Sequence, residues 1–533
     1  MTDQGRKKTQ EWGTQIGVIL AVSGSAVGLG NFLRFPGQAV QHGGGAFMIP
    51  YLCALLLLAL PIGWAEWAMA RHGGEKGLHS GPAILGLIGR GRWARYFGVL
   101  SVLIPIVIYM YYVYIEAWCL RYAWQYLVGS VDLGTDAAGY AAASGELFNE
   151  VTGIAENGVL LGGSLHMSVV FWLIVVVLNI ILVYRGLSGG IEKFCRFAMP
   201  AMAILAIIVL IRVLTLGTPD PTHPERSVIA GLGFMWNPDF SKLAKFDTWL
   251  AAAGQIFFSL SVGFGVILNY ASYLKKKDDV ALSGLTAGST NELFEVGFGG
   301  LITVTAAFVF LGASGMAGGT FGVGFSTLPV VFEHMGVAGR FVGFAWFFLL
   351  FLAAVTSSIS MLQPAKAFFE EALGLSPGRA VGVVSGLCAI GSLWVIWFSK
   401  GLVALDTMDF WIGTFAIFIL ATVQIICFAW IWGIKRGAAE LDQGALIRIP
   451  RVFFFVMKYV APLYLIVILI GFAWQNLPGY LRTLIQNPVA VWTLMLIGVN
   501  LVLLLILVYV GERRWRAAGL DIDGTHPDVE PGP

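Results

Sequence analysis

Charged side chains are scarce in this chain. Asp, Glu, Lys and Arg make up 12% of the 533 residues, whereas hydrophobic residues make up 57%, and the mean hydropathy is +0.79. Soluble domains carry about a quarter charged residues, so this composition excludes a soluble globular protein and indicates a membrane protein. The net charge of +2 comes without a basic face, because the basic residues lie between apolar segments. We therefore expect the lipid bilayer, and no nucleic acid, as a partner.

Cysteine is also rare, and its placement excludes two further classes. The five cysteines all lie in apolar segments, at spacings that suit neither a metal site nor a secreted disulfide framework. We interpret them as small core residues. The spans also lack a nucleophile–base pairing, so we predict neither an enzyme nor an organic cofactor. Residues 1–10 are short and basic, and no cleavage-site pattern follows the first apolar segment, so we expect no signal peptide.

Long apolar segments are what the chain has in abundance. A membrane-spanning helix needs about 20 apolar residues, and windows of that length predict an all-α, polytopic protein with twelve spans. They lie near 13–41, 46–71, 93–127, 166–184, 191–214, 245–274, 281–312, 339–373, 378–398, 405–432, 453–476 and 488–511.

Loop charges predict the orientation. The loop 128–166 carries five acidic residues and neither lysine nor arginine, whereas basic residues such as Arg90, Arg92 and Arg95 fall on the other side. Positive loops face the cytoplasm. We therefore predict that both termini are cytoplasmic and that the protein resides in the cell (plasma or inner) membrane.

Two of the spans are broken. Residues 24–31 (GSAVGLGN) place three glycines in a span, and residues 257–265 (FFSLSVGFG) interrupt the sixth span. Backbone groups freed inside a bilayer need protein, ion or substrate partners. Glycine also serves helix packing, which would explain either break alone. Breaks in the first and sixth spans occupy matching places in two five-helix halves, the known signature of an inverted-repeat transporter with a site near the membrane midplane.

Several strings carry a family resemblance. Residues 21–36 (AVSGSAVGLGNFLRFP), 43–47 (GGGAF), 64–67 (WAEW), 111–116 (YYVYIE), 254–258 (GQIFF), 356–358 (TSS) and 406–411 (DTMDFW) resemble the neurotransmitter:sodium symporter family, in particular its prokaryotic amino-acid branch. The resemblance extends from about residue 11 to about residue 515. It implies a 5+5 inverted repeat with broken helices 1 and 6. The predicted organisation is a cytoplasmic segment 1–12, a first repeat 13–214, an extracellular loop 215–244, a second repeat 245–432, two further spans in 433–511, and a cytoplasmic tail 512–533.

The resemblance implies two sodium sites, and sodium prefers oxygen ligands of the kind that broken spans offer. The first site would use the carbonyl of Ala26, the side chains of Asn31 and Asn291, the carbonyl and hydroxyl of Ser259, and the substrate carboxylate. The second would use Thr356 and Ser357 with the carbonyls of Gly24, Val27 and Ala353. From the residues alone, Asn291 could equally make an interhelical hydrogen bond, and the two hydroxyls could bond to their own preceding turn.

A substrate site follows from the same breaks. N–H groups at the start of a half-helix attract a carboxylate, and Gly28 stands where monoamine carriers have an aspartate, so an α-amino acid is favoured over a monoamine. Mostly apolar residues would line the side-chain pocket and favour a neutral, hydrophobic amino acid. Ser25 replaces the asparagine of leucine-type members. The substrate contacts that the resemblance implies are Ser25, Ala26, Leu29, Gly30, Ile108, Tyr112, Phe258, Ser259, Ser261, Phe264, Ser357 and Met361.

Charges inside spans are costly and need partners. The resemblance pairs Arg34 with Asp409 as an outer gate above the Tyr112–Phe258 lid. It also places the carboxylate of Glu295, near Tyr51, Gln255, Ser259 and Asn291, where animal members bind chloride. Transport would then need no chloride, and protonation of Glu295 could couple to the return step.

The inner gate departs from the family pattern. Thr9 stands where the family has arginine, and the acid of the eighth span is Glu371 rather than aspartate; Tyr273 matches another member of this network. Lys8 and Lys366 are the two candidate replacements, the latter four residues before Glu370.

The function expected from these residues is a sodium-coupled symporter of a neutral amino acid that works by alternating access with two sodium ions. A proton-coupled transporter on the same fold is the alternative, and a sensor that does not transport is a third. The oligomeric state is open between a monomer and a homodimer.

Overall fold

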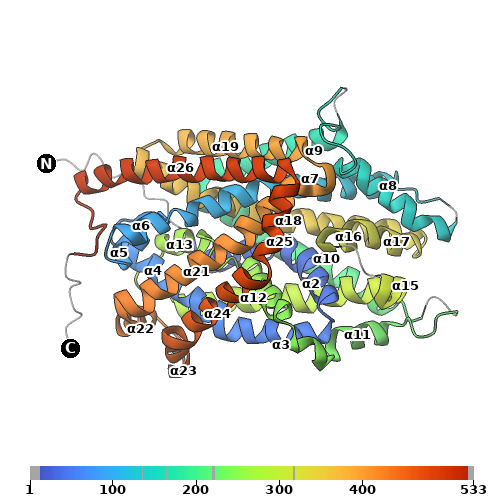
Figure 1. Cartoon of the computed structure of the whole chain (residues 1–533), viewed down its shortest axis with the longest axis horizontal. Helices are drawn as coiled ribbons and strands as arrows, with labels where there is room; N and C mark the ends of the chain where they lie inside the picture. The colour runs from blue at the N-terminus through green and yellow to red at the C-terminus, as the bar shows by residue number, and fades with distance from the viewer. Residues whose placement is uncertain (1–11, 135, 164–165, 219–221, 316–318, 526–533) are drawn as a thin grey trace.

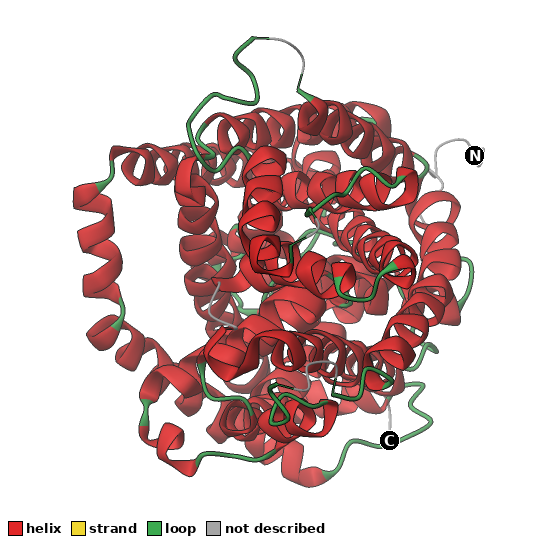
Figure 2. Ribbon diagram, turned by 90° about the vertical axis from the view of Figure 1, so that its right-hand side faces the viewer, coloured by secondary structure: helices red, strands yellow, loops and turns green. Residues whose placement is uncertain are grey.

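The computed structural model describes residues 12–134, 136–163, 166–218, 222–315 and 319–525. Regular structure in these residues is helical, apart from one isolated bridge between Gly44 and Pro238. The long helices run roughly side by side along the longest axis of the molecule, with α5 and α6 at one end of the bundle and α8, α11 and α17 at the other (Figure 1). Figure 2 looks onto this second end, where loops join the red helices.

The helices follow the predicted spans closely. Those in the spans are α1 (Gln15–Ala26), α2 (Phe35–Gln41), α3 (Gly45–Ala54), α4 (Leu60–Glu75), α7 (Leu100–Val128), α9 (Met167–Tyr184), α10 (Lys193–Leu214), α12 (Phe246–Leu260), α13 (Val266–Tyr270), α14 (Val280–Glu292), α15 (Thr305–Gly315), α18 (Val337–Leu373), α19 (Pro377–Trp397), α20 (Val403–Phe410), α21 (Ile417–Ile426), α23 (Arg451–Phe455), α24 (Ala461–Gln475) and α26 (Pro488–Ala517). Shorter helices lie between them: α5 (Gly81–Ile88), α6 (Arg92–Phe97), α8 (Tyr140–Thr152), α11 (Val228–Trp236), α16 (Gly319–Gly322), α17 (Leu328–Glu333), α22 (Ile434–Asp442) and α25 (Leu477–Gln486).

By length and composition, ten continuous helices of the described chain could cross a membrane, and the pair Ile16–Ala26 and Gly30–Gln41, bent by 44°, makes eleven. The predicted sixth span is α12 followed by α13. The 15 residues of α12 rise only about 22 Å, less than the roughly 30 Å of a bilayer core. The polytopic all-α architecture is therefore confirmed, whereas the count of twelve spans and the inverted repeat stay predictions.

Burial separates central from peripheral helices. In the most apolar window of the segment Arg92–Val128, which contains α7, 94% of residues are buried, and in that of α18 89% are. The corresponding value is 28% for α26 and 33% for the segment with α10. The exposed residues of α10 include Ile204, Ile207 and Ile211. An apolar outer face around a polar-containing core is what a lipid environment requires.

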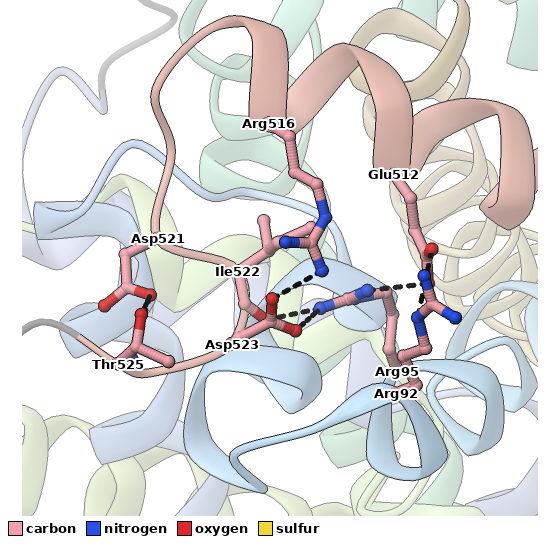
Figure 3. Close-up of polar contacts among 8 residues, drawn as sticks. All are labelled: Arg92, Arg95, Glu512, Arg516, Asp521, Ile522, Asp523 and Thr525. Carbon is pink, nitrogen blue, oxygen red and sulfur yellow. Dashed lines mark hydrogen bonds and ion pairs between the residues drawn. The ribbon is translucent and has the colours of Figure 1, made fainter.

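The end of the chain folds back onto the bundle (Figure 3). Helix α26 continues to Ala517, six residues into the predicted tail, because Glu512 pairs with Arg95 of α6 at 2.6 Å. Arg95 is fully buried and also donates to the carbonyl of Ile522, at 2.8 Å, and to Asp523. Residues 518–525 thus cover an arginine that would otherwise be buried without enough partners.

Candidate functional site

The first break lies where α1 ends at Ala26. Val27 is extended (φ −74°, ψ 96°), and a π-helical turn, Gly30–Arg34, precedes α2. The freed N–H groups find side-chain acceptors: that of Gly28 donates to Asn31 Oδ1 at 2.8 Å, and that of Leu29 donates to the hydroxyl of Tyr112 at 2.9 Å. The break therefore orients two predicted site residues by satisfying its own backbone.

Close packing explains the glycine at position 28. A Cβ there would lie 2.5 Å from Ser357 Oγ and 2.7 Å from the hydroxyl of Tyr112, both closer than carbon and oxygen can approach. An aspartate, as in monoamine carriers, would not fit this arrangement without displacing one of them.

The second break spans 261–265, between α12 and α13. Ser261 (φ 54°), Gly263 (φ 71°) and Gly265 (φ 92°) turn the chain through left-handed conformations. The Ser261 hydroxyl lies 3.4 Å from the carbonyl of Ser25, so the two breaks meet. Glu66 accepts from the N–H of Gly263 at 3.2 Å, a role that sequence reasoning missed although WAEW was among the family strings.

The residues predicted for the first sodium ion form one buried cluster. Asn31 Nδ2 donates to Asn291 Oδ1 at 2.8 Å and lies 3.4 Å from Ser259 Oγ. Asn291 Nδ2 donates to Ser259 Oγ at 2.8 Å and to Glu295 Oε2 at 3.0 Å. Asn31, Asn291, Ser259 and Glu295 are each at most 1% exposed. The cluster brings amide, hydroxyl and carboxylate oxygens together, which are ligand types that suit a hard monovalent cation.

Two carboxylates, rather than one, lie beside this cluster. Gln255 Nε2 donates to Glu295 Oε1 at 2.7 Å and to the carbonyl of Gly30 at 3.2 Å, as expected for a residue next to the fixed charge. The hydroxyl of Tyr51 donates to Glu292 at 2.9 Å. Sequence reasoning missed Glu292, although its position three residues before Glu295 places it on the same helix face.

The residues predicted for the second sodium ion also meet. Thr356 Oγ1 lies 3.0 Å from the carbonyl of Ala353, and Ser357 Oγ lies 3.4 Å from that of Gly24 and 3.0 Å from that of Ser25. The hydroxyls of α18 thus face both their own preceding turn and the end of α1. Val27, whose carbonyl was predicted to join them, is the residue at which α1 loses its helical geometry.

The predicted substrate pocket is buried and narrow. Ile108, Phe264 and Met361 are at most 5% exposed, and the rings of Phe258 and Phe264 meet edge to face with centroids 6.1 Å apart. The space beside Leu29, Tyr112 and Phe258 is about 20 Å³, room for about one water molecule.

On the far side of Arg34 lies a much wider opening. It has a volume of about 470 Å³ and is lined mostly by polar residues, among them Asp247, Asp406 and Asn476. Arg34 and Asp409 line both spaces, so they stand at the boundary between a closed pocket and an open vestibule.

Four contacts hold this boundary. The Arg34 guanidinium lies 3.8 Å from Asp409 Oδ2, 3.1 Å from the hydroxyl of Thr414, and 4.5 Å from the centroid of the Phe258 ring. The Tyr111 hydroxyl donates to Asp409 at 2.7 Å. Arg34 and the Phe258 ring of the lid thus lie together as predicted. Tyr111 and Thr414 also contact the Arg34–Asp409 pair.

At the opposite end of the pathway, Glu371 accepts from the Ser80 hydroxyl and from the N–H of His79, while Lys366 lies 3.7 Å from Glu370. Thr9 and Lys8 lie outside the described residues, so the pairing of Lys8 with Glu371 stays a prediction. Sequence reasoning missed these neutral donors from the loop before α5. Serine hydroxyls and backbone N–H groups carry no sequence signature for this role.

Aromatic rings complete that closure. Trp12 donates from Nε1 to the carbonyl of Tyr270 at 3.0 Å, and Tyr273 stacks on His79 with centroids 4.3 Å apart. His79 lies outside the spans, and burial lowers its pKa to about 4. The imidazole is therefore neutral in this closed arrangement.

Comparison with known proteins agrees with this geometry. Residues 9–150 and 140–513 match the sequence profile of the sodium:neurotransmitter symporter family. The chain is 29% identical over 86% of its length, and 89% of the relative's, to an uncharacterized sodium-dependent transporter of Methanocaldococcus jannaschii. It is 27% identical over 87% of its length, and 98% of the relative's, to one of Haemophilus influenzae.

A solved structure extends the similarity to three dimensions. The crystal structure of MhsT in complex with L-phenylalanine superposes with a TM-score of 0.75 at 26% identity, covering 87% of this chain and 99% of that one. The family consists of membrane transporters rather than enzymes, and its members couple transport to sodium. The profile match spans nearly all of the chain and includes both broken helices, and the chain therefore belongs to the sodium:neurotransmitter symporter family.

Proposed function

We propose that the protein is a sodium-coupled symporter for a neutral, hydrophobic α-amino acid, with two sodium ions per cycle and no requirement for chloride. It would work in the cell (plasma or inner) membrane, with both termini cytoplasmic. The observation that carries the proposal is the meeting of the two breaks, where polar oxygens, non-helical backbone and an apolar pocket lie together around 25–31 and 258–264.

Substrate orientation would come from the chain's own dipoles. The Tyr112 hydroxyl accepts from the N–H of Leu29, so its proton remains available to donate to a carboxylate. The ammonium group would meet the carbonyls at Ala26, Phe258 and Ser259. With a glycine at position 28 that has no room for an acid, the substrate would have to bring its own carboxylate, which favours amino acids over monoamines.

Side-chain specificity would come from Ile108, Phe258, Phe264 and Met361, which offer no charge to an acidic or basic substrate. MhsT, a structural neighbour, was crystallised with L-phenylalanine. We therefore place large apolar amino acids first among the substrates to test.

Sodium is cargo in this scheme, and the donors in place suit two ions. Asn31, Asn291, Ser259 and Ala26 would hold the first beside the substrate carboxylate. Gly24, Val27, Ala353, Thr356 and Ser357 would hold the second in a neutral cage, which allows release. At ~100 mV and a roughly tenfold gradient, one ion supplies about 3.7 kcal/mol, enough for roughly 500-fold accumulation, and two allow roughly 10⁵-fold.

Uptake into proteoliposomes tests the proposal against a proton-coupled transporter on the same fold. Labelled phenylalanine and leucine should accumulate under an inward sodium gradient and fail to do so with choline and an inward proton gradient. Equal uptake in the two conditions would favour proton coupling. Absence of uptake and of binding for every neutral amino acid would refute the substrate class.

A further inference from the structure

Glu192 reaches from the start of α10 to the first turn of α1. It is the last residue of the π-helical turn Leu187–Glu192, and it is 2% exposed. Its carboxylate accepts from the N–H of Gly13 at 2.9 Å and from the Thr14 hydroxyl at 3.1 Å, groups that lie nearly 180 residues away in the chain.

The electrostatics of this contact are favourable. Thr14 is the N-cap of α1, and its Oγ1 accepts from the N–H of Gly17 at 3.0 Å. The beginning of a helix carries unpaired N–H groups and partial positive charge, which stabilise a nearby carboxylate. Arg196 also contacts Glu192, at 2.9 Å, but its side chain is 59% exposed. Solvent screens the charge of an arginine this exposed, whereas the contacts with Gly13 and Thr14 join Glu192 directly to α1.

The backbone is shaped to receive this carboxylate. A Cβ on Gly17 would lie 2.1 Å from Glu192 Oε1. Any side chain at position 17 would therefore push the carboxylate away from α1, even though the glutamate itself is unchanged.

We propose that Glu192 fastens the cytoplasmic end of α1 to α10 and so holds the inner pathway closed, in place of the ion pair that Thr9 cannot make. This inference rests on the proposed function, because α1 ends in the carbonyls assigned to sodium and substrate. Moving α1 away from α10 exposes a buried carboxylate and breaks two hydrogen bonds to it. The Trp12–Tyr270 contact is the second attachment of the same helix end.

Labelling of a buried cysteine tests the proposal without requiring transport. Ala271 follows Tyr270 and is fully buried, so an Ala271→Cys protein should react slowly with a hydrophilic thiol reagent. Adding Glu192→Ala should raise the labelling rate about tenfold, equivalent to about 1.4 kcal/mol, and Glu192→Gln should raise it less. The protein without Ala271→Cys measures the background from the native cysteines.

Gly17→Ala provides the matched test, because it keeps the glutamate in the chain but displaces its carboxylate from α1. Alanine favours a helix over glycine, so a general effect on α1 would lower labelling, whereas displacement of Glu192 should raise it. Added to Glu192→Ala, it should have no further effect, since neighbouring changes that act on one contact are not additive. Arg196→Ala should change the rate less than twofold.

Unchanged labelling in Glu192→Gln and Gly17→Ala would overturn the proposal, as would multiplicative effects of Glu192→Ala and Gly17→Ala. Failure of this proposal can be told apart from failure of the proposed function. If the Ala271→Cys protein labels at the same rate with and without sodium and shows no uptake, the sodium-coupled scheme fails, while the comparison among variants still decides the role of Glu192.

Discussion

The outer boundary offers the sharpest test of how the site closes, through replacement of Arg34. The guanidinium is 13% exposed, lies 3.8 Å from an Asp409 oxygen and covers the Phe258 ring at 4.5 Å. Arg34→Ala removes both contacts at once and should therefore weaken binding and slow closure over the substrate. Arg34→Lys keeps the charge but loses the planar group that contacts Asp409 and Thr414 together.

The magnitude can be worked from these contacts. A cation over an aromatic face in a partly buried site contributes about 1 kcal/mol. A partly shielded ion pair of this length, with Asp409 29% exposed, contributes about 1 kcal/mol after solvent screening. Losing about 2 kcal/mol raises the apparent Kd roughly 30-fold. Asp409→Asn should cost less, about fivefold, because the Tyr111 hydroxyl still has an acceptor and the cation–ring contact survives.

Binding of labelled phenylalanine to purified protein in sodium gives the apparent Kd of each variant, and uptake gives the corresponding KM. The double variant should be less damaged than the two single effects multiplied, by about 1 kcal/mol. Tyr111→Phe serves as the control that removes a donor to Asp409 without removing a charge. Strict additivity, or a wild-type Kd in Arg34→Ala, would refute the closure of the pocket by this pair.

Four further outcomes follow from the structure. Wild-type uptake should persist when gluconate replaces chloride, and Glu295→Ser should become chloride-dependent because it removes the fixed charge; loss of wild-type uptake without chloride would contradict this. Thr356→Ala with Ser357→Ala should abolish sodium-driven uptake while leaving the folded yield unchanged, and unaltered transport would remove the second sodium site. Deleting residues 518–533 should lower the thermal unfolding midpoint by several degrees, because Arg95 loses the Ile522 carbonyl and the carboxylate of Asp523; Arg95→Met in the deleted protein should recover part of the loss, and a deletion without effect would show that the tail is dispensable. Burial lowers the pKa of His79 to about 4, so its neutral form is favoured in the closed state. Stability from this group should be complete above pH 6.5 and decline by up to about 3 kcal/mol as pH falls toward 4, and His79→Gln should flatten that part of the unfolding profile against pH.

Several parts of the site could be read from local sequence because local physics determines them. Glycines at 24, 28 and 30 release backbone groups that a bilayer cannot satisfy, so a polar site at the break follows without knowledge of the fold. Family strings then supplied the register for Asn31, Asn291, Thr356 and Ser357, and the structure brings these residues together as two clusters. Their sodium ligation stays a prediction.

Where partners are neutral or distant in sequence, the same reasoning missed contacts. Glu292, which accepts from the Tyr51 hydroxyl, was not anticipated beside Glu295, because only packing shows which carboxylates of one helix face the tyrosine. Nor were the Ser80 hydroxyl and the backbone N–H from which Glu371 accepts. Hydroxyls and amides are too common for a sequence pattern to identify the pair.

The amino-acid sequence by itself determined that this is a polytopic helical membrane protein, since bilayer thickness sets the length of an apolar segment residue by residue. It also determined where the helices break, since glycine-rich stretches act on their own backbone. Tertiary structure decided which groups close the pathway at either end. Three contacts join segments that are far apart in the chain: Glu192 accepts from the start of α1, Glu66 accepts from Gly263, and Arg95 donates to the C-terminal tail. A buried charge pairs with whichever partners the packed helices bring within reach.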